Sequence, residues 1–148
     1  MIPKEIIIHH SASGFNTTIT LLDSWHFVRG FPKSSLNYFI GYHYVILEHG
    51  EVIQTRRDIE IGAHCPPNDG RIGVCLMGNF TDLDPTPEQL KSLTELTIKL
   101  KILYNIDMVF GHRDCNKTEC PGDRLYIFAL IDKLNWLQKL IISLFKNH

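Results

Sequence analysis

Several features that define other classes of protein are missing from this sequence of 148 residues. It has no apolar run long enough to cross a membrane, no internal repeat and no Gly/Ser-rich linker. Lys and Arg are scattered and the net charge is -1, so there is no clustered basic surface and we expect no nucleic-acid partner. With 44% hydrophobic and 21% charged residues, the composition indicates one globular domain with its own core.

The beginning of the chain also lacks the pattern of a signal peptide. An apolar run of three isoleucines is all that separates Glu5 from His9. We therefore expect synthesis in the cytoplasm, where thiols stay reduced. In that setting the four cysteines are expected to be core residues or metal ligands rather than two disulfides, and they are Cys65, Cys75, Cys115 and Cys120.

Apolar periodicity and turn residues divide the chain into alternating strands and helices. Thr86 followed by Pro87 is typical of a helix start, and His49-Gly50 predicts a hairpin turn. The predicted strands are 5–9, 42–47, 52–54, 72–76 and 108–111, and the predicted helices are 20–29, 86–103 and one that begins near 123 or 124. This order predicts a single α/β domain with a central mixed sheet flanked by about three helices.

The first predicted helix places Leu21, Leu22, Trp25 and Val28 on one face, which we expect to be buried. The amphipathic tail 134–145 fits a helix packed on the core, although a membrane surface or a partner are alternatives. We expect a domain core of about 4–134 and a helical extension over 135–148.

Three chemically reactive residues follow predicted strands. His9 stands where a buried strand ends, His112 follows another strand, and Cys120 comes eight residues after His112. If those two strands are neighbours, the loop between His112 and Cys120 can bring the thiol back to both imidazoles. Two histidines and one cysteine form a catalytic type of zinc site, because the fourth position stays open for water.

Spacing alone leaves alternatives to this zinc site. A single histidine at a strand end or a buried cysteine is more often structural. His9 and His10 point to opposite faces of a strand, so only one of them can join the set. A cysteine peptidase that uses Cys120 or Cys115 with His112 is disfavoured, since Pro121 follows Cys120 directly and no helix begins there.

Five blocks resemble, in order and spacing, the N-acetylmuramoyl-L-alanine amidases of the phage-lysozyme and peptidoglycan-recognition-protein type. The resemblance covers about Lys4 to Leu134, nearly the whole chain. The blocks are Ile8-His9-His10-Ser11-Ala12, Gly41-Tyr42-His43-Tyr44, Gly62-Ala63-His64, the segment 72–80, and Gly111-His112-Arg113-Asp114 with Glu119-Cys120-Pro121-Gly122.

The resemblance implies one Zn²⁺ per chain, held by His9, His112 and Cys120, and hydrolysis of the amide between N-acetylmuramic acid and L-alanine in peptidoglycan. It also implies that Tyr42 assists catalysis. Thr118 stands where phage-type members carry a lysine and recognition-protein-type amidases carry a threonine, and a hydroxyl can donate to an oxyanion without adding charge. A non-catalytic module that binds or senses peptidoglycan is the alternative, and Cys120 argues for the enzyme.

Further expectations concern the residues that bind substrate and the place where the protein acts. The resemblance predicts that His26 and His64 bind substrate, and Asn79 is a further candidate, whereas His43 and Cys75 belong to the core. Arg113 and Asp114 are expected to brace the His112 loop. We expect a monomer that acts on the cell wall after release or non-classical export, as a phage endolysin does, or on cytosolic muropeptides.

Overall fold

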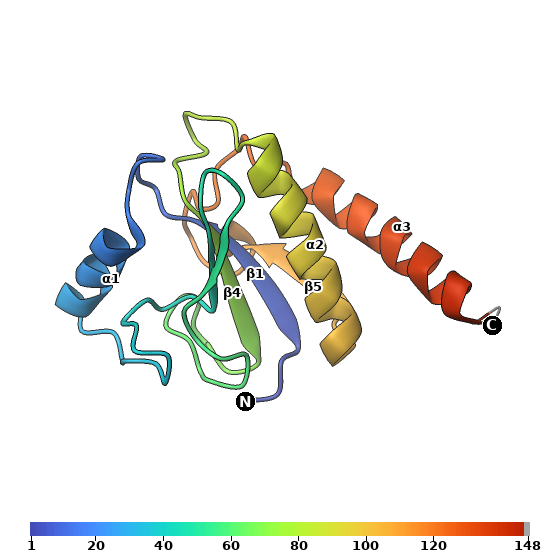
Figure 1. Cartoon of the computed structure of the whole chain (residues 1–148), viewed down its shortest axis with the longest axis horizontal. Coiled ribbons are helices and arrows are strands. Elements are labelled where there is room, and N and C mark those ends of the chain that lie inside the picture. The colour runs from blue at the N-terminus through green and yellow to red at the C-terminus, as the bar shows by residue number, and fades with distance from the viewer. Residues whose placement is uncertain (147–148) are drawn as a thin grey trace.

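The computed structural model of the chain describes residues 1–146, which fold around a five-stranded sheet (Figure 1). The sheet order is β3-β2-β4-β1-β5; β1, β2, β4 and β5 run parallel, and β3 pairs antiparallel with β2. The predicted mixed sheet and hairpin are therefore confirmed. The strands are β1 Glu5–His10, β2 Tyr44–Ile46, β3 Val52–Gln54, β4 Arg71–Leu76 and β5 Met108–Gly111.

Helices cover both faces of this sheet. α2 (Pro87–Tyr104) and α3 (Ile127–Lys146) lie on one side, and α1 (Ile19–Val28) lies on the other (Figure 1). The larger apolar cluster joins the sheet to α2 and α3, and a smaller one includes Leu22 of α1. Alternate residues of β1 point to these opposite sides, so Ile6 and Ile8 belong to the larger cluster.

The predicted start of the second helix is confirmed in detail. The Thr86 hydroxyl accepts from the backbone N–H of Gln89 at 3.1 Å, and the Gln89 side chain accepts from the N–H of Thr86 at 3.2 Å. Pro87 occupies the first turn, where its missing N–H costs no hydrogen bond. The helix ends at Tyr104, and the next residue, Asn105, caps it with a left-handed φ of 54°.

The buried face of α1 differs from the one that the sequence pattern predicted. Leu22 and His26 are buried at 2% and 3% exposure, whereas Trp25 is 39% and Val28 82% exposed. Leu22 and His26 lie one turn apart on the same side of the helix, and Leu22 packs into the smaller apolar cluster there. Trp25 is therefore a surface residue and His26 an interior one, the reverse of what apolarity suggests.

The last helix begins at Ile127, three to four residues later than predicted. Leu134 is fully buried, which confirms packing up to that point, but Leu144 is 60% and Phe145 79% exposed. Figure 1 shows the end of α3 projecting beyond the sheet. The prediction that the tail packs on the core is therefore wrong for these later residues, because no described element reaches them.

Within residues 1–146, no helix combines the length and apolar character needed to span a bilayer. Residues 147 and 148, at the end of the predicted extension, lie outside the described part of the chain.

Candidate metal centre

The C-terminal ends of β1 and β5 bring two predicted ligands together. The two strands are parallel neighbours with Ile8 opposite Gly111, so His9 and His112 follow at the same edge of the sheet. Their ring centroids are 4.5 Å apart. His112 starts a short 3-10 turn, His112–Asp114, which directs the chain away from the sheet. The condition that the two strands be neighbours is thus met.

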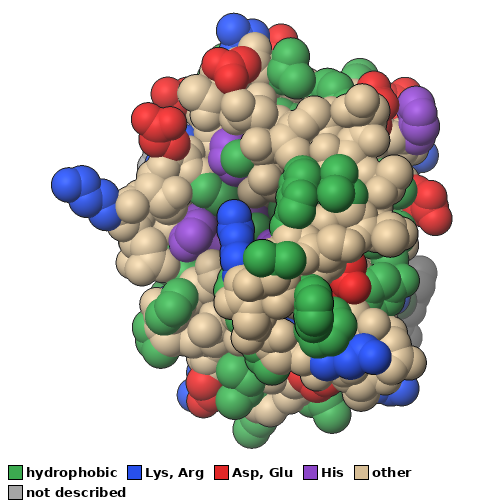
Figure 2. Space-filling view, turned by 90° about the vertical axis from the view of Figure 1, so that its left-hand side faces the viewer, with side chains coloured by type: hydrophobic (Ala, Val, Ile, Leu, Met, Phe, Trp, Pro, Cys, Tyr) green, Lys and Arg blue, Asp and Glu red, His purple; other side chains and the backbone are tan. Residues whose placement is uncertain are grey.

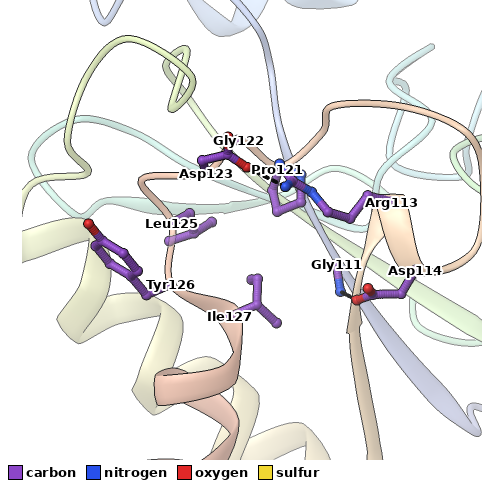
Figure 3. A pocket seen from close by; sticks show the side chains of 9 residues that line it. All are labelled: Gly111, Arg113, Asp114, Pro121, Gly122, Asp123, Leu125, Tyr126 and Ile127. Carbon is purple, nitrogen blue, oxygen red and sulfur yellow. Dashed lines mark hydrogen bonds and ion pairs between the residues drawn. The ribbon is translucent and has the colours of Figure 1, made fainter.

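The segment after this turn folds back and carries Cys120 to the same point. The N–H of Arg113 donates to the carbonyl of Cys120 at 2.8 Å, and the Arg113 guanidinium pairs with Asp123 and donates to the Glu119 carbonyl. Figure 3 shows this pairing, with the Asp114 carboxylate directed instead at Gly111. Asp114 accepts from the Gly111 N–H at 2.8 Å. Both residues brace the loop as expected, although not by pairing with each other.

His9, His112 and Cys120 each direct one ligand atom to a common point, and these atoms lie within 4.8 Å of one another. The Cys120 sulfur is 3.7 Å from Nδ1 of His9. Tetrahedral zinc with ordinary bond lengths would place a nitrogen and a sulfur ligand roughly 3.6 Å apart. The spacing, two imidazole nitrogens and one soft thiolate sulfur therefore fit Zn²⁺ with a fourth position left open.

Hydrogen bonds behind His9 fix which of its nitrogens faces the other ligands. Nε2 of His64 lies 3.2 Å from the carbonyl of Arg71, so this nitrogen carries a proton and donates it. Nδ1 of His64 is then an acceptor, and it lies 3.1 Å from Nε2 of His9. His9 therefore carries its proton on Nε2, which leaves the lone pair of Nδ1 free for a metal.

Burial controls the charges of the three ligands. The pKa of His9 is lowered well below its usual value, first by burial and then by the neighbouring histidines His64, His112 and His10. Burial likewise lowers the pKa of His112 and raises that of the Cys120 thiol to about 12, while the N–H of His10 at 3.4 Å and Arg113 oppose that rise. Both imidazoles are therefore neutral donors, and a metal ion would displace the thiol proton.

Tyr42 lies beside His9, with ring centroids 4.9 Å apart. Burial is the main reason that the pKa of its phenol is raised well above the usual value, and the neighbouring Cys75 and Cys120 thiols raise it further. A phenol in this state keeps its proton and acts as a donor. The structure thus brings the predicted catalytic tyrosine to the candidate metal ligands, and Cys75 is a fully buried core residue as expected.

His26 and His64 lie behind the site rather than on an open groove. Nδ1 of His26 accepts from the Gly41 N–H at 3.0 Å, and its ring packs 5.3 Å from that of Tyr42. Both ring nitrogens of His64 are engaged by protein groups, so neither is free for a substrate. The contacts therefore give both histidines a positioning role, and their contact with substrate stays a prediction.

A glycine in a buried strand marks the position of His64. A Cβ atom on Gly73 of β4 would come within 2.7 Å of the His64 ring, so only glycine lets the ring lie against the sheet. Gly73 also donates its N–H to Nδ1 of His43 at 3.0 Å, which explains why His43 is fully buried. In the sequence, Gly73 inside an otherwise apolar strand was the one sign that another side chain packs closely against the backbone at this point.

Thr118 and Asn79 line a depression next to Cys120, together with His10, Ala12, Thr81, Asp82 and Glu119. The Thr118 oxygen accepts from the Cys120 N–H at 3.2 Å, so its own hydrogen is available to a ligand. A second depression, lined by residues 11–13 with Trp25, Val28 and Arg29, shares Ala12 with the first. Figure 2 looks onto the α1 side and shows histidine side chains recessed in that surface.

This chain is similar to known proteins both in sequence and in fold. The chain is 32% identical to peptidoglycan-recognition protein SD of Drosophila melanogaster over 94% of its own length and 77% of that protein. It is 30% identical to the endolysin of Enterobacteria phage T3, with 80% of each chain covered. The solved N-acetylmuramoyl-L-alanine amidase LysC from Clostridium intestinale URNW superposes with a TM-score of 0.83 at 32% identity, covering 91% of this chain and 87% of LysC.

Residues 1–123 match the sequence pattern of one family, and this range contains all eight residues singled out for the site. The sheet, the paired strand ends and the returning cysteine loop all lie in the matched part. On this evidence the chain belongs to the N-acetylmuramoyl-L-alanine amidase family.

Proposed function

We propose that this protein is a zinc-dependent amidase that hydrolyses the bond between N-acetylmuramic acid and L-alanine in peptidoglycan. The observation that carries the proposal is the convergence of His9, His112 and Cys120 within 4.8 Å at the end of two parallel strands. Three protein ligands are the number found in catalytic zinc sites, whereas structural sites use four. One Zn²⁺ per chain is therefore expected.

When bound, zinc would lower the pKa of a water ligand to about 7 and polarise the substrate carbonyl. The protein residues have separate tasks. His64 holds the Nδ1 atom of His9 in the direction of the metal. The backbone N–H of His10 points at the Cys120 sulfur and favours its thiolate form.

Two hydroxyl groups are available to the carbonyl oxygen of the substrate. Thr118 has its oxygen anchored by the Cys120 N–H and its hydrogen free. Tyr42 keeps its proton because burial disfavours the phenolate. Neutral donors near the developing negative charge stabilise it more in the transition state than in the ground state. We assign both hydroxyls to this task.

The substrate would lie across the two depressions that share Ala12. Asn79 stands at one end of this path, with its amide already donating to Asp82 at 2.8 Å, and Trp25 and Arg29 stand at the other. A glycopeptide offers hydroxyls, amides and carboxylates, which suit this mixture of polar and aromatic side chains. We propose Asn79 as a contact residue and expect the protein to act as a monomer.

The direct test is digestion of purified sacculi and of defined muropeptides by the zinc-loaded protein, with the products identified by mass. We expect release of intact peptide stems that begin with L-alanine, and loss of that release after a chelator removes the metal. Comparison of sacculi with soluble muropeptides decides between action on the cell wall and action on cytosolic fragments. Cleavage that persists in metal-free protein contradicts the proposal.

Cys120→Ser supplies the matched variant, because it replaces the sulfur ligand with a weaker oxygen donor of similar size. We expect loss of both zinc and cleavage with an unchanged circular dichroism spectrum. Cys115→Ser is the control, since the same exchange outside the ligand set should keep both. Wild-type protein that is inactive and free of zinc, yet sediments with peptidoglycan, would instead indicate the non-catalytic module.

A further inference from the structure

Two cysteines outside the proposed ligand set meet beside the site. Cys65 follows His64 in the segment between β3 and β4, and Cys115 closes the turn that His112 begins. Neither is bonded to another cysteine in the structure. The side chain of Asn116, the residue after Cys115, contacts the Cys65 sulfur at 3.2 Å, and the Cys65 thiol lies close enough to raise the pKa of Cys115. Segments far apart in the sequence thus bring the two thiols into one neighbourhood.

The surroundings hold this pair in place from both sides. The Cys65 sulfur accepts from Nδ2 of Asn116 at 3.2 Å and from Nη1 of Arg71 at 3.4 Å. Asn116 is the direct neighbour of Cys115, so its contact ties the two loops together at the thiols. Cys65 is fully buried, whereas Cys115 is half-buried and accessible to a small reagent.

We propose that Cys65 and Cys115 are a site of reversible disulfide formation that joins the His64 loop to the His112 turn. The oxidant is a small-molecule disulfide such as oxidised glutathione. The Cys115 sulfur attacks one sulfur of the reagent, its S–S bond breaks, and one small thiol leaves. Cys65 then attacks the sulfur of Cys115 in the mixed disulfide and releases the second thiol. The two protein thiols lose two electrons and two protons, which reduce the reagent to two thiols.

The raised pKa of Cys115 also affects the rate of this reaction. Burial and the neighbouring Cys65 thiol raise the pKa of Cys115 to about 11, so little thiolate is present at neutral pH. Fast redox sensors instead carry thiolates of lowered pKa. The pair is thus suited to slow closure on entering an oxidising environment, where disulfides persist.

The cross-link itself does not depend on the proposed function. It would close a loop of roughly 50 residues and so restrict the unfolded chain, with an expected rise in melting temperature of about 5–10 °C. Its functional consequence does rest on the proposed function: the loop that orients His9 would be fixed to the turn that carries His112. Oxidised protein should then keep its zinc through more cycles of heating or chelation than reduced protein.

The test incubates the zinc-loaded full chain for hours with oxidised glutathione, blocks remaining thiols with N-ethylmaleimide, and maps peptides by mass spectrometry. We expect a peptide pair linked through Cys65 and Cys115, an intact mass lower by two hydrogen atoms, and full reversal by dithiothreitol. Zinc content, read by elemental analysis, should stay at one per chain. These readouts do not use enzymatic activity.

Variants make the assignment specific. Cys115→Ser should abolish the cross-link and the rise in melting temperature, whereas Cys75→Ala should keep both, since Cys75 lies in β4 and contacts Tyr42 instead. If Cys65→Ser fails to fold, the wild-type peptide map and Cys115→Ser still decide. A map that shows Cys120 in the disulfide, or glutathione retained on Cys115 with no cross-link, overturns the proposal.

Discussion

Nε2 of His9 lies 3.1 Å from Nδ1 of His64, and this contact decides which nitrogen of His9 can bind a metal. The direction of the hydrogen bond follows from the Arg71 carbonyl, which accepts from the other nitrogen of His64 at 3.2 Å. A residue expected to touch substrate thus acts on the proposed metal site from behind. Partners of this kind make a ligand more basic and hold its ring in the correct orientation.

Replacing His64 by alanine should weaken zinc binding by about 10- to 100-fold, because His9 loses the acceptor that fixes its tautomer. The measurement is zinc competition against a chromophoric chelator. His49→Ala, at an exposed turn position, is the matched control and should bind zinc as the wild type does. Equal affinity in His64→Ala and His49→Ala would contradict the positioning role.

Thr118→Val should lower kcat by roughly 10- to 100-fold and leave KM nearly unchanged, since the lost hydrogen bond forms mainly in the transition state. Valine keeps the shape of threonine and removes the hydroxyl. Thr118→Ser restores the donor and should recover most of kcat. The experiment is steady-state kinetics on a defined muropeptide, and a change confined to KM would assign Thr118 to ground-state binding.

Tyr42→Phe should also reduce kcat, by roughly 10-fold or more, while zinc content stays at one per chain. The phenylalanine ring can still pack against His9, so the ligand keeps its neighbour. Zinc analysis beside the kinetics separates the two explanations. If Tyr42→Phe loses zinc, the tyrosine supports the metal site and its hydroxyl has no separate catalytic task.

Stability should fall between pH 6.5 and about pH 4 because of His26. Burial, with Arg29 as the next cause, lowers the pKa of this residue to about 4 from an ordinary 6.5. The unfolded chain therefore binds a proton over this range that the folded chain does not, so the contribution is complete above pH 6.5 and lost as the pH falls. Its size is on the order of 2–3 kcal/mol.

Urea unfolding at several pH values measures this slope. His26→Gln is the informative variant, because its side-chain oxygen can accept from the Gly41 N–H without titrating. The free energy of unfolding of this variant should depend less on pH between 4 and 6.5. Identical slopes in variant and wild type would show that other groups cause the acid sensitivity.

Leu134→Ala should destabilise the fold by about 2–4 kcal/mol, because Leu134 is fully buried and its removal leaves a cavity. Leu144→Ala, in the same helix, should change the free energy of unfolding by about 0.5 kcal/mol or less, since Leu144 is 60% exposed. Urea unfolding of the two variants compares them directly. A large loss in Leu144→Ala would mean that the end of α3 packs on something in solution.

Local signals in the sequence were sufficient for most elements of the fold. Strands of apolar residues, the cap at Thr86 and the turn at His49-Gly50 act over a few neighbours, so their patterns can be recognised without the rest of the chain. The candidate ligands His9, His112 and Cys120 were also recognisable, because each stands at the end of a strand or loop with characteristic neighbours.

Contacts between residues far apart in the sequence were determined only by the tertiary structure. The sequence pattern could not show that His64 lies behind His9, that α1 buries His26 and exposes Trp25, or that Cys65 meets Cys115. Apolar periodicity continues along α3 to its last turn, yet Leu144 and Phe145 are exposed. Periodicity reports which face of a helix is apolar, whereas only the packing of distant segments determines what that face meets.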